Sequence, residues 1–319
     1  MSVKIIAEIG SNWHTLDDCM MSISQAKACG VDAVKFQLYS EVELYGFREG
    51  YYRIVEKNTG RVAYELPPEW LPKLKGKADA VGIEFMVTAF SPEGYDLVNQ
   101  YVDTHKVASS EMCHVRILER LRSYGKPVIL STGAQHAEDI SRAVAALEGV
   151  PVTLLYCVPE YPARSVDLIE MGILRDTFGL PVGYSDHTVD SIDIPRLAAE
   201  LGATVIEKHV NFTEHTDTPD APHSLNGEEF KRMVHVLRDT EARVRAPSYP
   251  SMILRHKRRL IAMRDISEGE TLTEGTNFGI YRSLKDDTHA FPPFMVNEVE
   301  GRTAKRAIKA GDGVGPGDV

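Results

Sequence analysis

The feature of this sequence that most restricts its fold is a regular alternation along roughly its first 240 residues. Short apolar runs rich in β-branched residues alternate with longer amphipathic segments, and the runs cover residues 4–10, 33–39, 82–90, 104–110, 127–133, 152–158, 181–188 and 203–210. Near-continuous apolar runs are typical of strands buried on both faces, as in a parallel sheet. Several intervening segments end on a glycine suited to the left-handed residue that terminates a helix, at Gly30, Gly125 and Gly202.

Eight strand–helix units in a stretch of this length match a (β/α)8 TIM barrel in number and size. We therefore predict an α/β fold of this kind. The alternative is a doubly wound open sheet, which is expected to have fewer strands and often a glycine-rich phosphate loop. No such loop is found in the sequence.

Composition narrows the class of protein. The chain has 319 residues, 43% hydrophobic and 26% charged, which is typical of a globular protein with one large domain or two. A net charge of −10 disfavours nucleic acids and anionic membranes as partners, although a few local cations can still bind an anionic substrate. The four cysteines form no CxxC pair, and no apolar run reaches the length of a signal peptide or membrane span. We expect a cytoplasmic protein with reduced thiols.

Polar residues gather where each apolar run ends. Buried charge is costly unless it is paired or functional, and the carboxyl ends of barrel strands converge on one mouth, where active sites are built. A single such residue is more simply explained as a buried polar group whose hydrogen bonds are satisfied within the core. Polar residues at eight strand ends in succession are not explained in this way. The run ends supply Glu8, Lys35, Gln37, Thr88, Lys106, Ser109, Glu111, Ser131, Thr132, Tyr161, Ser185, Asp186, His187, Glu207, Lys208 and His209.

These residue types indicate two kinds of ligand. Lysines together with hydroxyl groups suit a phosphate or carboxylate, because each donates hydrogen bonds to an oxyanion. The histidines His187 and His209, at the ends of adjacent runs, suit a divalent metal. Strand alternation places Glu207 and His209 on one face and Lys208 on the other, so Lys208 faces either the barrel wall or the site.

A Schiff-base aldolase is the chemical alternative, since a barrel lysine can form an imine with a keto substrate. It requires a lysine with a depressed pKa in an apolar setting, whereas the lysines here lie among carboxylates and hydroxyls, which favours the charged form. A non-catalytic carbohydrate-binding protein is a further alternative, which the polar barrel mouth disfavours.

Seven motifs, in order and at matching intervals, resemble the sialic acid synthase family, which includes N-acetylneuraminate, legionaminate and pseudaminate synthases and spore-coat polysaccharide proteins. The motifs are AEIGSN, VKFQ, KVASSE, GKPVILSTG, CVPEYP, PVGYSDHT and VIEKH, and the resemblance extends from residue 4 to about 235. The tail, with RRLIAMRDISEGETLTEGTNFGIYR and EVEGRTAKRAIKAGDGV, resembles the small antifreeze-like (SAF) domain of that family. The expected organisation is a barrel domain over 1–240, a linker over 241–256 and the small domain over 257–319.

The resemblance implies a condensation of phosphoenolpyruvate (PEP) with the aldehyde of an open-chain N-acetylated amino sugar, of the N-acetylmannosamine or 2,4-diacetamido-hexose type. The products are a nonulosonic acid and inorganic phosphate. Glu111 then occupies the position of the catalytic carboxylate, and Glu8 completes the site near the metal. His187 and His209 hold the cofactor, Mn²⁺ or Mg²⁺. The PEP-binding residues implied are Lys35, Thr88, Lys106, Ser109, Ser131 and Ser185, and those facing the sugar are Gln37, Tyr161, Asp220 and Arg282.

The resemblance further implies a domain-swapped homodimer, in which the tail domain of one chain caps the barrel of the other and contributes Arg282. The sequence departs from the family pattern at Trp13, at Pro159, in TPDAPHSL after the last run and in the loop around Arg282. The form TPDAPHSL is nearer the pseudaminate and spore-coat branches. These departures leave the identity of the sugar open.

Overall fold

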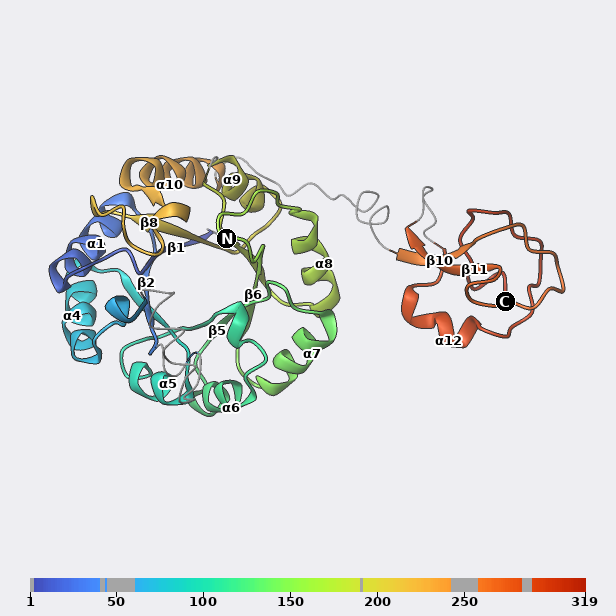
Figure 1. The fold of residues 1–319 in the computed structure, drawn as a ribbon, viewed down its shortest axis with the longest axis horizontal. Helices are drawn as coiled ribbons and strands as arrows, with labels where there is room; N and C mark the ends of the chain where they lie inside the picture. The colour runs from blue at the N-terminus through green and yellow to red at the C-terminus, as the bar shows by residue number, and fades with distance from the viewer. Residues whose placement is uncertain (1–2, 41–43, 45–60, 190–191, 242–257, 283–288) are drawn as a thin grey trace. The chain divides into compact units, whose positions relative to one another are not determined.

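The computed structural model describes residues 3–40, 44, 61–189, 192–241, 258–282 and 289–319, and the predicted linker therefore lies almost entirely outside the described residues. The chain divides into two compact units, Met1–Ala246 and Pro247–Val319. Among the described residues, the barrel of the first unit consists of eight parallel strands, each followed along the chain by a helix (Figure 1).

The strands of the first unit are β1 Lys4–Gly10, β2 Ala33–Leu38, β3 Glu84–Ala89, β4 His105–Val107, β5 Val128–Ser131, β6 Val152–Cys157, β7 Val182–Asp186 and β8 Val205–Asn211. The helices are α1 Leu16–Cys29, α4 Leu71–Val81, α5 Pro92–Val98, α6 Val115–Tyr124, α7 Ala137–Ala146, α8 Ile169–Phe178, α9 Asp193–Glu200 and α10 Gly227–Glu241. A two-residue strand, β9 Leu225–Asn226, pairs with the end of β8.

The sheet closes on itself. Strand β1 pairs in parallel with β2, where Glu8 lies opposite Lys35, and also with β8, where Glu8 lies opposite His209. The closed ring confirms the predicted (β/α)8 barrel and excludes the open sheet. The predicted run over 104–110 was too long: β4 ends at Val107, and the chain turns into a 3-10 helix over Ser109–Glu111.

Local sequence explains where the first helix begins and ends. Thr15 accepts a hydrogen bond from the backbone N–H of Asp18, and the Asp18 carboxylate accepts one in return from the backbone of Thr15, which is a capping box. The helix stops at Gly30, whose φ of 83° is left-handed. The predicted terminators Gly125 and Gly202 also have positive φ, at 68° and 91°.

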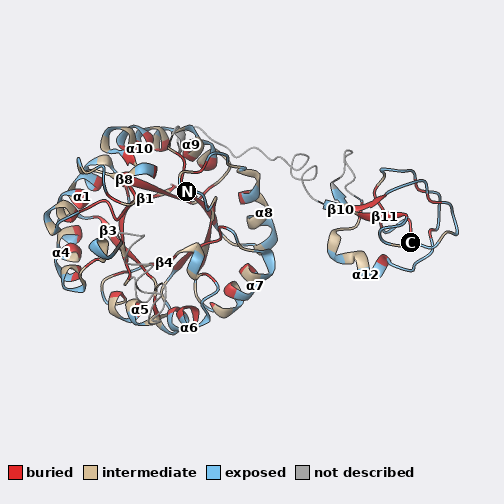
Figure 2. Cartoon of the chain, viewed as in Figure 1, coloured by how far each residue is buried: buried red, intermediate tan, exposed pale blue. Residues whose placement is uncertain are grey.

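The barrel interior has an apolar floor below a polar layer. Outward-facing strand residues pack against the helices in one large core, and Figure 2 shows the ring of strands as buried. The inward-facing floor consists of Ile6, Ala33, Met86, Ile129, Leu155 and Val205. Gly183 lies beside Val205 at this level and leaves no room for a side chain, because an added Cβ would lie 2.4 Å from the carbonyl oxygen of Val205. Two residues further along each strand the inward side chains are polar, and this is where the site is built.

The second unit has its own hydrophobic core. Strand β10 (Arg258–Ala262) pairs antiparallel with β11 (Phe278–Arg282), and a short helix, α12, spans Val296–Val299. The core consists of Leu260, Ala262, Ile266, Leu272, Phe278, Val299, Ala304, Ile308, Val314 and Val319. Across the described residues of both units, no helix is both long and apolar enough to cross a membrane.

Candidate active site

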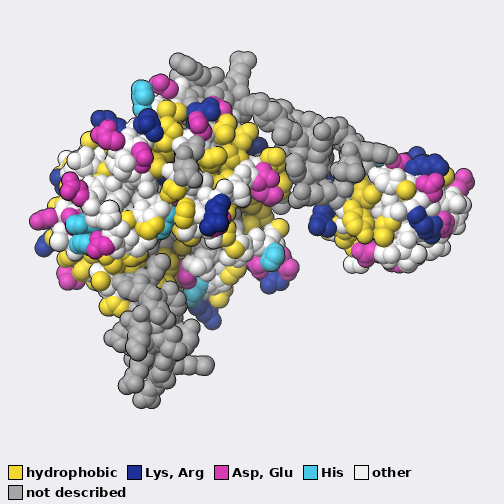
Figure 3. Space-filling model, turned by 45° about the horizontal axis from the view of Figure 1, so that its top comes forward, with side chains coloured by type: hydrophobic (Ala, Val, Ile, Leu, Met, Phe, Trp, Pro, Cys, Tyr) yellow, Lys and Arg dark blue, Asp and Glu magenta, His cyan; other side chains and the backbone are white. Residues whose placement is uncertain are grey.

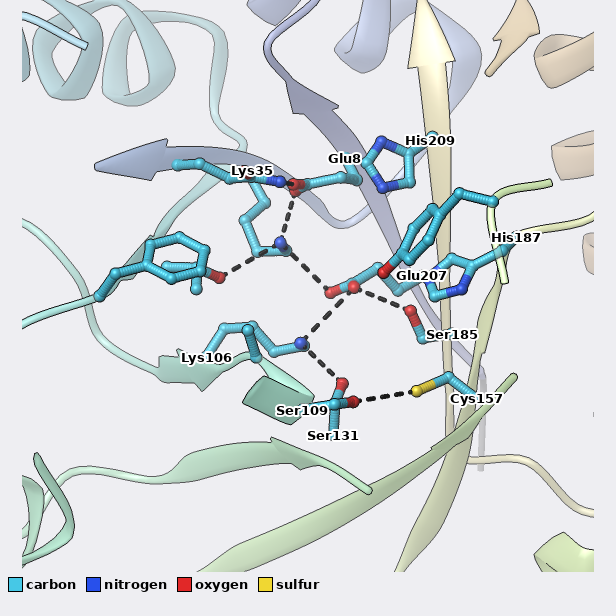
Figure 4. Close-up of a pocket in the computed structure, with 15 residues that line it drawn as sticks. Glu8, Lys35, Lys106, Ser109, Ser131, Cys157, Ser185, His187, Glu207 and His209 are labelled. Carbon is cyan, nitrogen blue, oxygen red and sulfur yellow. Dashed lines mark hydrogen bonds and ion pairs between the residues drawn. The ribbon is translucent and has the colours of Figure 1, made fainter. Parts of the chain in front are cut away.

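A cavity lies at the carboxyl ends of the barrel strands (Figure 4). Of the residues to which the family resemblance assigns a role, the wall contains all but three, Glu111, Asp220 and Arg282. The lining residues are Glu8, Lys35, Gln37, Thr88, Phe90, Lys106, Ala108, Ser109, Ser131, Cys157, Tyr161, Ser185, His187, Glu207 and His209. Strand alternation places part of this wall, because the floor residues Ile6, Ala33, Met86, Ile129 and Val205 are each followed two residues later by a polar lining residue. Tyr161 and His187 lie beyond the strand ends.

Two lysines and two carboxylates form the centre of the cavity. Lys35 Nζ lies 2.5 Å from a carboxylate oxygen of Glu8 and 3.6 Å from one of Glu207. Lys106 Nζ also lies 3.6 Å from Glu207, so Glu207 lies between the two ammonium groups. All four side chains are at least nine-tenths buried. Because buried charges are costly when unpaired, this alternation of sign is what allows four ionisable groups to share one interior layer.

The two carboxyl groups differ in their proton affinity. Burial raises the pKa of Glu8 above its usual value, and the neighbouring Lys35 compensates only in part. Burial acts in the same direction on Glu207, but Lys106 and Lys35 together hold its pKa at about 2. Burial lowers the pKa of Lys106 despite Glu207, whereas Glu207 and Glu8 outweigh burial at Lys35 and raise its pKa. Paired carboxyls with divergent pKa values can divide the roles of proton donor and fixed anion.

Hydroxyl groups extend the lysine pair into a polar cradle. Lys106 donates to Ser131 Oγ at 2.8 Å, and Lys35 donates to Thr88 Oγ1 at 3.3 Å. Ser185 donates to Glu207 at 3.0 Å. Ser109 Oγ accepts the backbone N–H of Gly133 at 2.9 Å and also lies 3.2 Å from Cys157 Sγ. The lysine ammonium groups and the hydroxyl groups can donate hydrogen bonds to an oxyanion bound in the cavity.

The two predicted histidines face the same cavity. The rings of His187 and His209 have centroids 6.1 Å apart, and the ring of Tyr161 stacks on His187 at 4.1 Å. His187 Nδ1 lies 2.7 Å from the carbonyl oxygen of Val158. Because a carbonyl oxygen can only accept, Nδ1 carries the ring hydrogen, and the lone pair of Nε2 is left to bind a metal. Burial lowers the pKa of His187 to about 4 and that of His209 well below its usual range. Both rings are therefore neutral, the form that binds metals.

A second buried ion pair joins β7 and β8 on the outer face of the barrel. Lys208 Nζ is 2.6 Å from Asp186 Oδ2, and neither side chain is exposed to solvent. Asp186 Oδ1 also accepts the Tyr184 hydroxyl at 2.9 Å and the Thr188 backbone N–H at 2.9 Å. Lys208 is not among the residues that line the cavity, so of the two orientations considered, it faces the barrel wall.

Three predicted residues lie elsewhere. Glu111 ends the 3-10 helix after β4, is half-buried and does not line the cavity; burial raises its pKa. Asp220 is buried beside His209 and not on the cavity wall. The backbone of Arg282 ends β11 in the second unit, and its side chain lies outside the described part of the chain. Their roles stay predictions.

The structure adds residues to which sequence reasoning assigned no role. Glu207 is central to the cavity, and the strand alternation that placed it beside His209 would have been a sufficient signal. Cys157 lies on the wall, with Sγ 3.2 Å from Ser109 Oγ, two residues after the floor residue Leu155. His223 contacts Asp220 from a loop, where no strand periodicity could have indicated it.

A closed (β/α)8 barrel whose mouth gathers buried lysines, carboxylates and imidazoles has the architecture of a barrel enzyme. Comparison with known proteins specifies the family: the NeuB family model matches residues 22–247, and the chain belongs to the NeuB family. It is similar to N,N'-diacetyllegionaminic acid synthase of Legionella pneumophila, with 32% identity over 86% of this chain and 84% of that protein.

Two further similarities cover different shares of the chain. Pseudaminic acid synthase of Helicobacter pylori is 28% identical over 99% of this chain and 97% of its own length. The crystal structure of N-acetylneuraminic acid synthetase from Leptospira borgpetersenii superposes with a TM-score of 0.70 and 29% identity, and covers 78% of this chain and 88% of that one. The chain is thus a sialic acid synthase-like enzyme.

Proposed function

We propose that this enzyme condenses PEP with an N-acetylated amino sugar to form a nonulosonic acid and phosphate. The observation that carries the proposal is the cradle of Lys35 and Lys106 with the hydroxyls of Thr88 and Ser131, since cations and hydroxyl groups gathered in one cavity suit the phosphate and carboxylate of PEP. The names of the relatives favour a 2,4-diacetamido-hexose as the sugar, and N-acetylmannosamine is the other candidate.

In the proposed reaction C3 of PEP attacks the aldehyde carbon of the open-chain sugar. Water adds at C2, and phosphate leaves with cleavage of its C–O bond. Glu8, whose pKa is raised by burial, is suited to exchange a proton with the aldehyde oxygen or the water. Glu207 remains an anion that positions both lysines. Glu111 is assigned the proton transfer at C2 and C3, and Gln37, Tyr161 and Asp220 are assigned to the sugar.

A divalent cation, Mn²⁺ or Mg²⁺, is part of the proposal. The residues fit such an ion, because His209 Nδ1 is buried yet has no hydrogen-bond partner among the described residues, and a second neutral imidazole and a carboxylate lie nearby. Imidazole with carboxylate suits Mn²⁺ better than Mg²⁺, which prefers oxygen ligands throughout. When bound, the ion would polarise the aldehyde oxygen.

Phosphate release from PEP, followed with a panel of N-acetylated hexosamines, tests the function. We expect one phosphate per nonulosonic acid, loss of turnover with a chelator and recovery with Mn²⁺. A His187→Ala, His209→Ala double variant should lose turnover by about 10²-fold or more, because a metal used as a Lewis acid supplies several kcal/mol. His235→Ala, on the exposed face of α10, is the control. Full turnover of the chelated double variant would reject the metal.

One observation favours the aldolase alternative enough to require a control. Burial lowers the pKa of Lys106, which is the property of a Schiff-base lysine, although Glu207 supports its charged form. Borohydride treatment in the presence of a keto substrate should leave the enzyme active and unmodified if PEP condensation is correct. Covalent trapping at Lys106 would instead support the aldolase.

The assignment of Glu111 predicts a specific kinetic pattern. Glu111→Gln should keep its affinity for PEP while kcat falls by about 10²- to 10⁴-fold, the usual contribution of a general acid or base. Glu119→Gln, which changes an exposed carboxylate on α6, is the matched control. Near-normal turnover of Glu111→Gln would transfer the proton-transfer role to Glu8, the carboxyl that lines the cavity.

We further propose a homodimer in which the tail unit of one chain, a SAF domain, caps the barrel of the other. A cap would shield the reacting species from water. Hydrophobic side chains gather on one side of the small unit in Figure 3. Its described residues include three exposed large apolar side chains, Phe294, Tyr281 and Met263, at 79%, 46% and 44%, which favours docking against another surface.

Two full-length variants, Glu111→Gln with impaired turnover in the barrel and Arg282→Ala in the tail, test this arrangement. When they are mixed and allowed to exchange, the intact barrel of one receives the intact tail of the other in a swapped dimer, so about a quarter of the sites should be active. If each tail serves its own barrel, mixing restores nothing. A fully active monomer in sedimentation measurements would also contradict the proposal.

A further inference from the structure

The turn that follows β4 carries two residues of the proposed mechanism but lies beyond the end of the strand. Ser109 and Glu111 belong to the 3-10 helix Ser109–Glu111, and β4 ends before it, at Val107. A 3-10 helix of three residues has little stability of its own, because its hydrogen bonds are few and poorly aligned. The positions of both side chains therefore depend on what holds this turn against the barrel.

The side chain of Gln135 connects this turn to a neighbouring loop. Gln135 lies between β5 and α7, and its Nε2 atom donates a hydrogen bond to the backbone carbonyl oxygen of Ser109 at 2.9 Å. Because a carbonyl oxygen can only accept, the amide must present its NH2 group to the turn. The other end of the amide is also engaged, since Cys113 Sγ donates to Gln135 Oε1 at 3.4 Å. The amide thus contacts the chain on both sides of Glu111.

A second contact from the same loop reaches the side chain of Ser109, which lines the cavity. The backbone N–H of Gly133 donates to Ser109 Oγ at 2.9 Å. Gly133 is packed too closely for a side chain, because an added Cβ would lie 2.7 Å from Cys157 Sγ and 3.0 Å from Ser109 Oγ. One loop therefore binds both the hydroxyl and the backbone carbonyl of Ser109.

This loop is itself held in an uncommon conformation. The backbone N–H of Gln135 donates to the carbonyl oxygen of Thr132 at 3.3 Å and closes a four-residue turn. Within the turn Ala134 has a φ of 57°, in the left-handed region that residues with a side chain rarely adopt. Thr132 is anchored by its backbone N–H and its hydroxyl, which both donate to the carbonyl oxygen of Leu155. Such strain persists where surrounding contacts enforce it, and it is frequent at functional sites.

We propose that Gln135 is a positioning residue for the reaction, because it fixes the turn that carries Ser109 and Glu111. The proposal rests on the role proposed above for Glu111 and on the PEP contact that the family resemblance implies for Ser109. Gln135 does not line the cavity, so it acts through the turn and not on the substrate. Loss of this contact would let the Glu111 carboxylate move, and a displacement of about 1 Å is enough to cost about 10²-fold in rate.

Gln135→Met tests the proposal, because methionine keeps the length of the side chain and removes the donor. We expect kcat to fall by about 10- to 100-fold and PEP affinity by about 3- to 10-fold. Gln135→Glu, which keeps an acceptor for Cys113 but has no donor for Ser109, should show the same losses. Gln100→Met is the matched control, since Gln100 is exposed and also donates to a backbone carbonyl, that of Leu97. Circular dichroism verifies that each variant is folded.

Double variants distinguish positioning from a general structural role. If Gln135 acts through the turn, Gln135→Met should lower kcat by less than about 2-fold in a Glu111→Gln background. In a Ser109→Ala background it should leave PEP affinity, measured by equilibrium binding, unchanged. Equal losses with and without these two side chains would overturn the proposal, as would wild-type kcat and PEP affinity in Gln135→Met.

Deuterium exchange at the backbone amides of residues 109–113 needs no substrate, so it separates this proposal from the proposed function. The N–H groups of Glu111 and Met112 donate hydrogen bonds within the turn. Exchange about 3- to 10-fold faster in Gln135→Met than in Gln100→Met would support the anchoring of the turn even if no amino sugar releases phosphate from PEP. Equal exchange in the two variants would reject the anchoring, whatever the reaction is.

Discussion

Lys106→Met is expected to weaken PEP binding by about 10²- to 10³-fold, because truncating one partner of a buried charge pair costs 2 to 5 kcal/mol or more. Methionine preserves the length and apolar stem of the side chain. It removes the ammonium group that donates a hydrogen bond to Ser131 Oγ at 2.8 Å. This group is also one of the two ammonium groups beside Glu207. The loss should therefore appear in the PEP concentration required for half-maximal rate more than in the maximal rate.

Lys73→Met, an exposed position on α4, provides the control for the substitution itself. PEP affinity can be measured by equilibrium binding, independently of the sugar and of turnover. If Lys106→Met binds PEP as tightly as the wild type, the cradle of lysines and hydroxyls is not the PEP site, and the proposed function loses its main support.

The second large effect is expected on stability, from a lysine-to-methionine substitution at Lys208, on the outer face of β8. Lys208→Met should lower the free energy of unfolding of the barrel by about 3 to 5 kcal/mol, because it leaves the Asp186 carboxylate buried without its countercharge. Asp186 would keep only its hydrogen bonds from Tyr184 and Thr188. Urea denaturation followed by circular dichroism measures the loss.

A double variant separates the ion pair from other effects of the substitution. Asp186→Asn combined with Lys208→Met removes both charges and should recover part of the lost stability, since no unpaired charge remains. A loss below about 1 kcal/mol in Lys208→Met would be typical of a surface pair and would contradict the buried network. PEP affinity of the folded Lys208→Met variant should stay near that of the wild type.

These two lysines illustrate how far strand periodicity extends. Alternation in the last predicted run placed Glu207 and His209 on one face and Lys208 on the other, and the structure has Lys208 paired with Asp186 away from the cavity. The same alternation accounts for the polar layer, since Ile6 in the floor is followed by Glu8 and Leu155 by Cys157. Period-two geometry is local, so it can be read without knowing the fold.

The predicted run over 104–110 shows where this reasoning fails. Lys106 was predicted at the barrel mouth and lines the cavity, but the strand ends at Val107 and the chain turns through Ser109–Glu111. Alternation has no meaning in a turn, and so the direction of Glu111 could not be predicted from its spacing. The structure places it half-buried and off the cavity wall.

By itself, the sequence determined the number of strand–helix units, the barrel they form and the inward residues of the strand ends, because short-range periodicity and helix termination depend on neighbouring residues. Only the tertiary structure decided which charges pair and which loop returns to the site. Glu207 meets Lys35 and Lys106 because ring closure brings distant strands to one axis. His223 meets Asp220 and His209 through a loop that has no periodicity. The backbone N–H of Ser11, more than 200 positions earlier, donates a hydrogen bond to Asp220 in this loop.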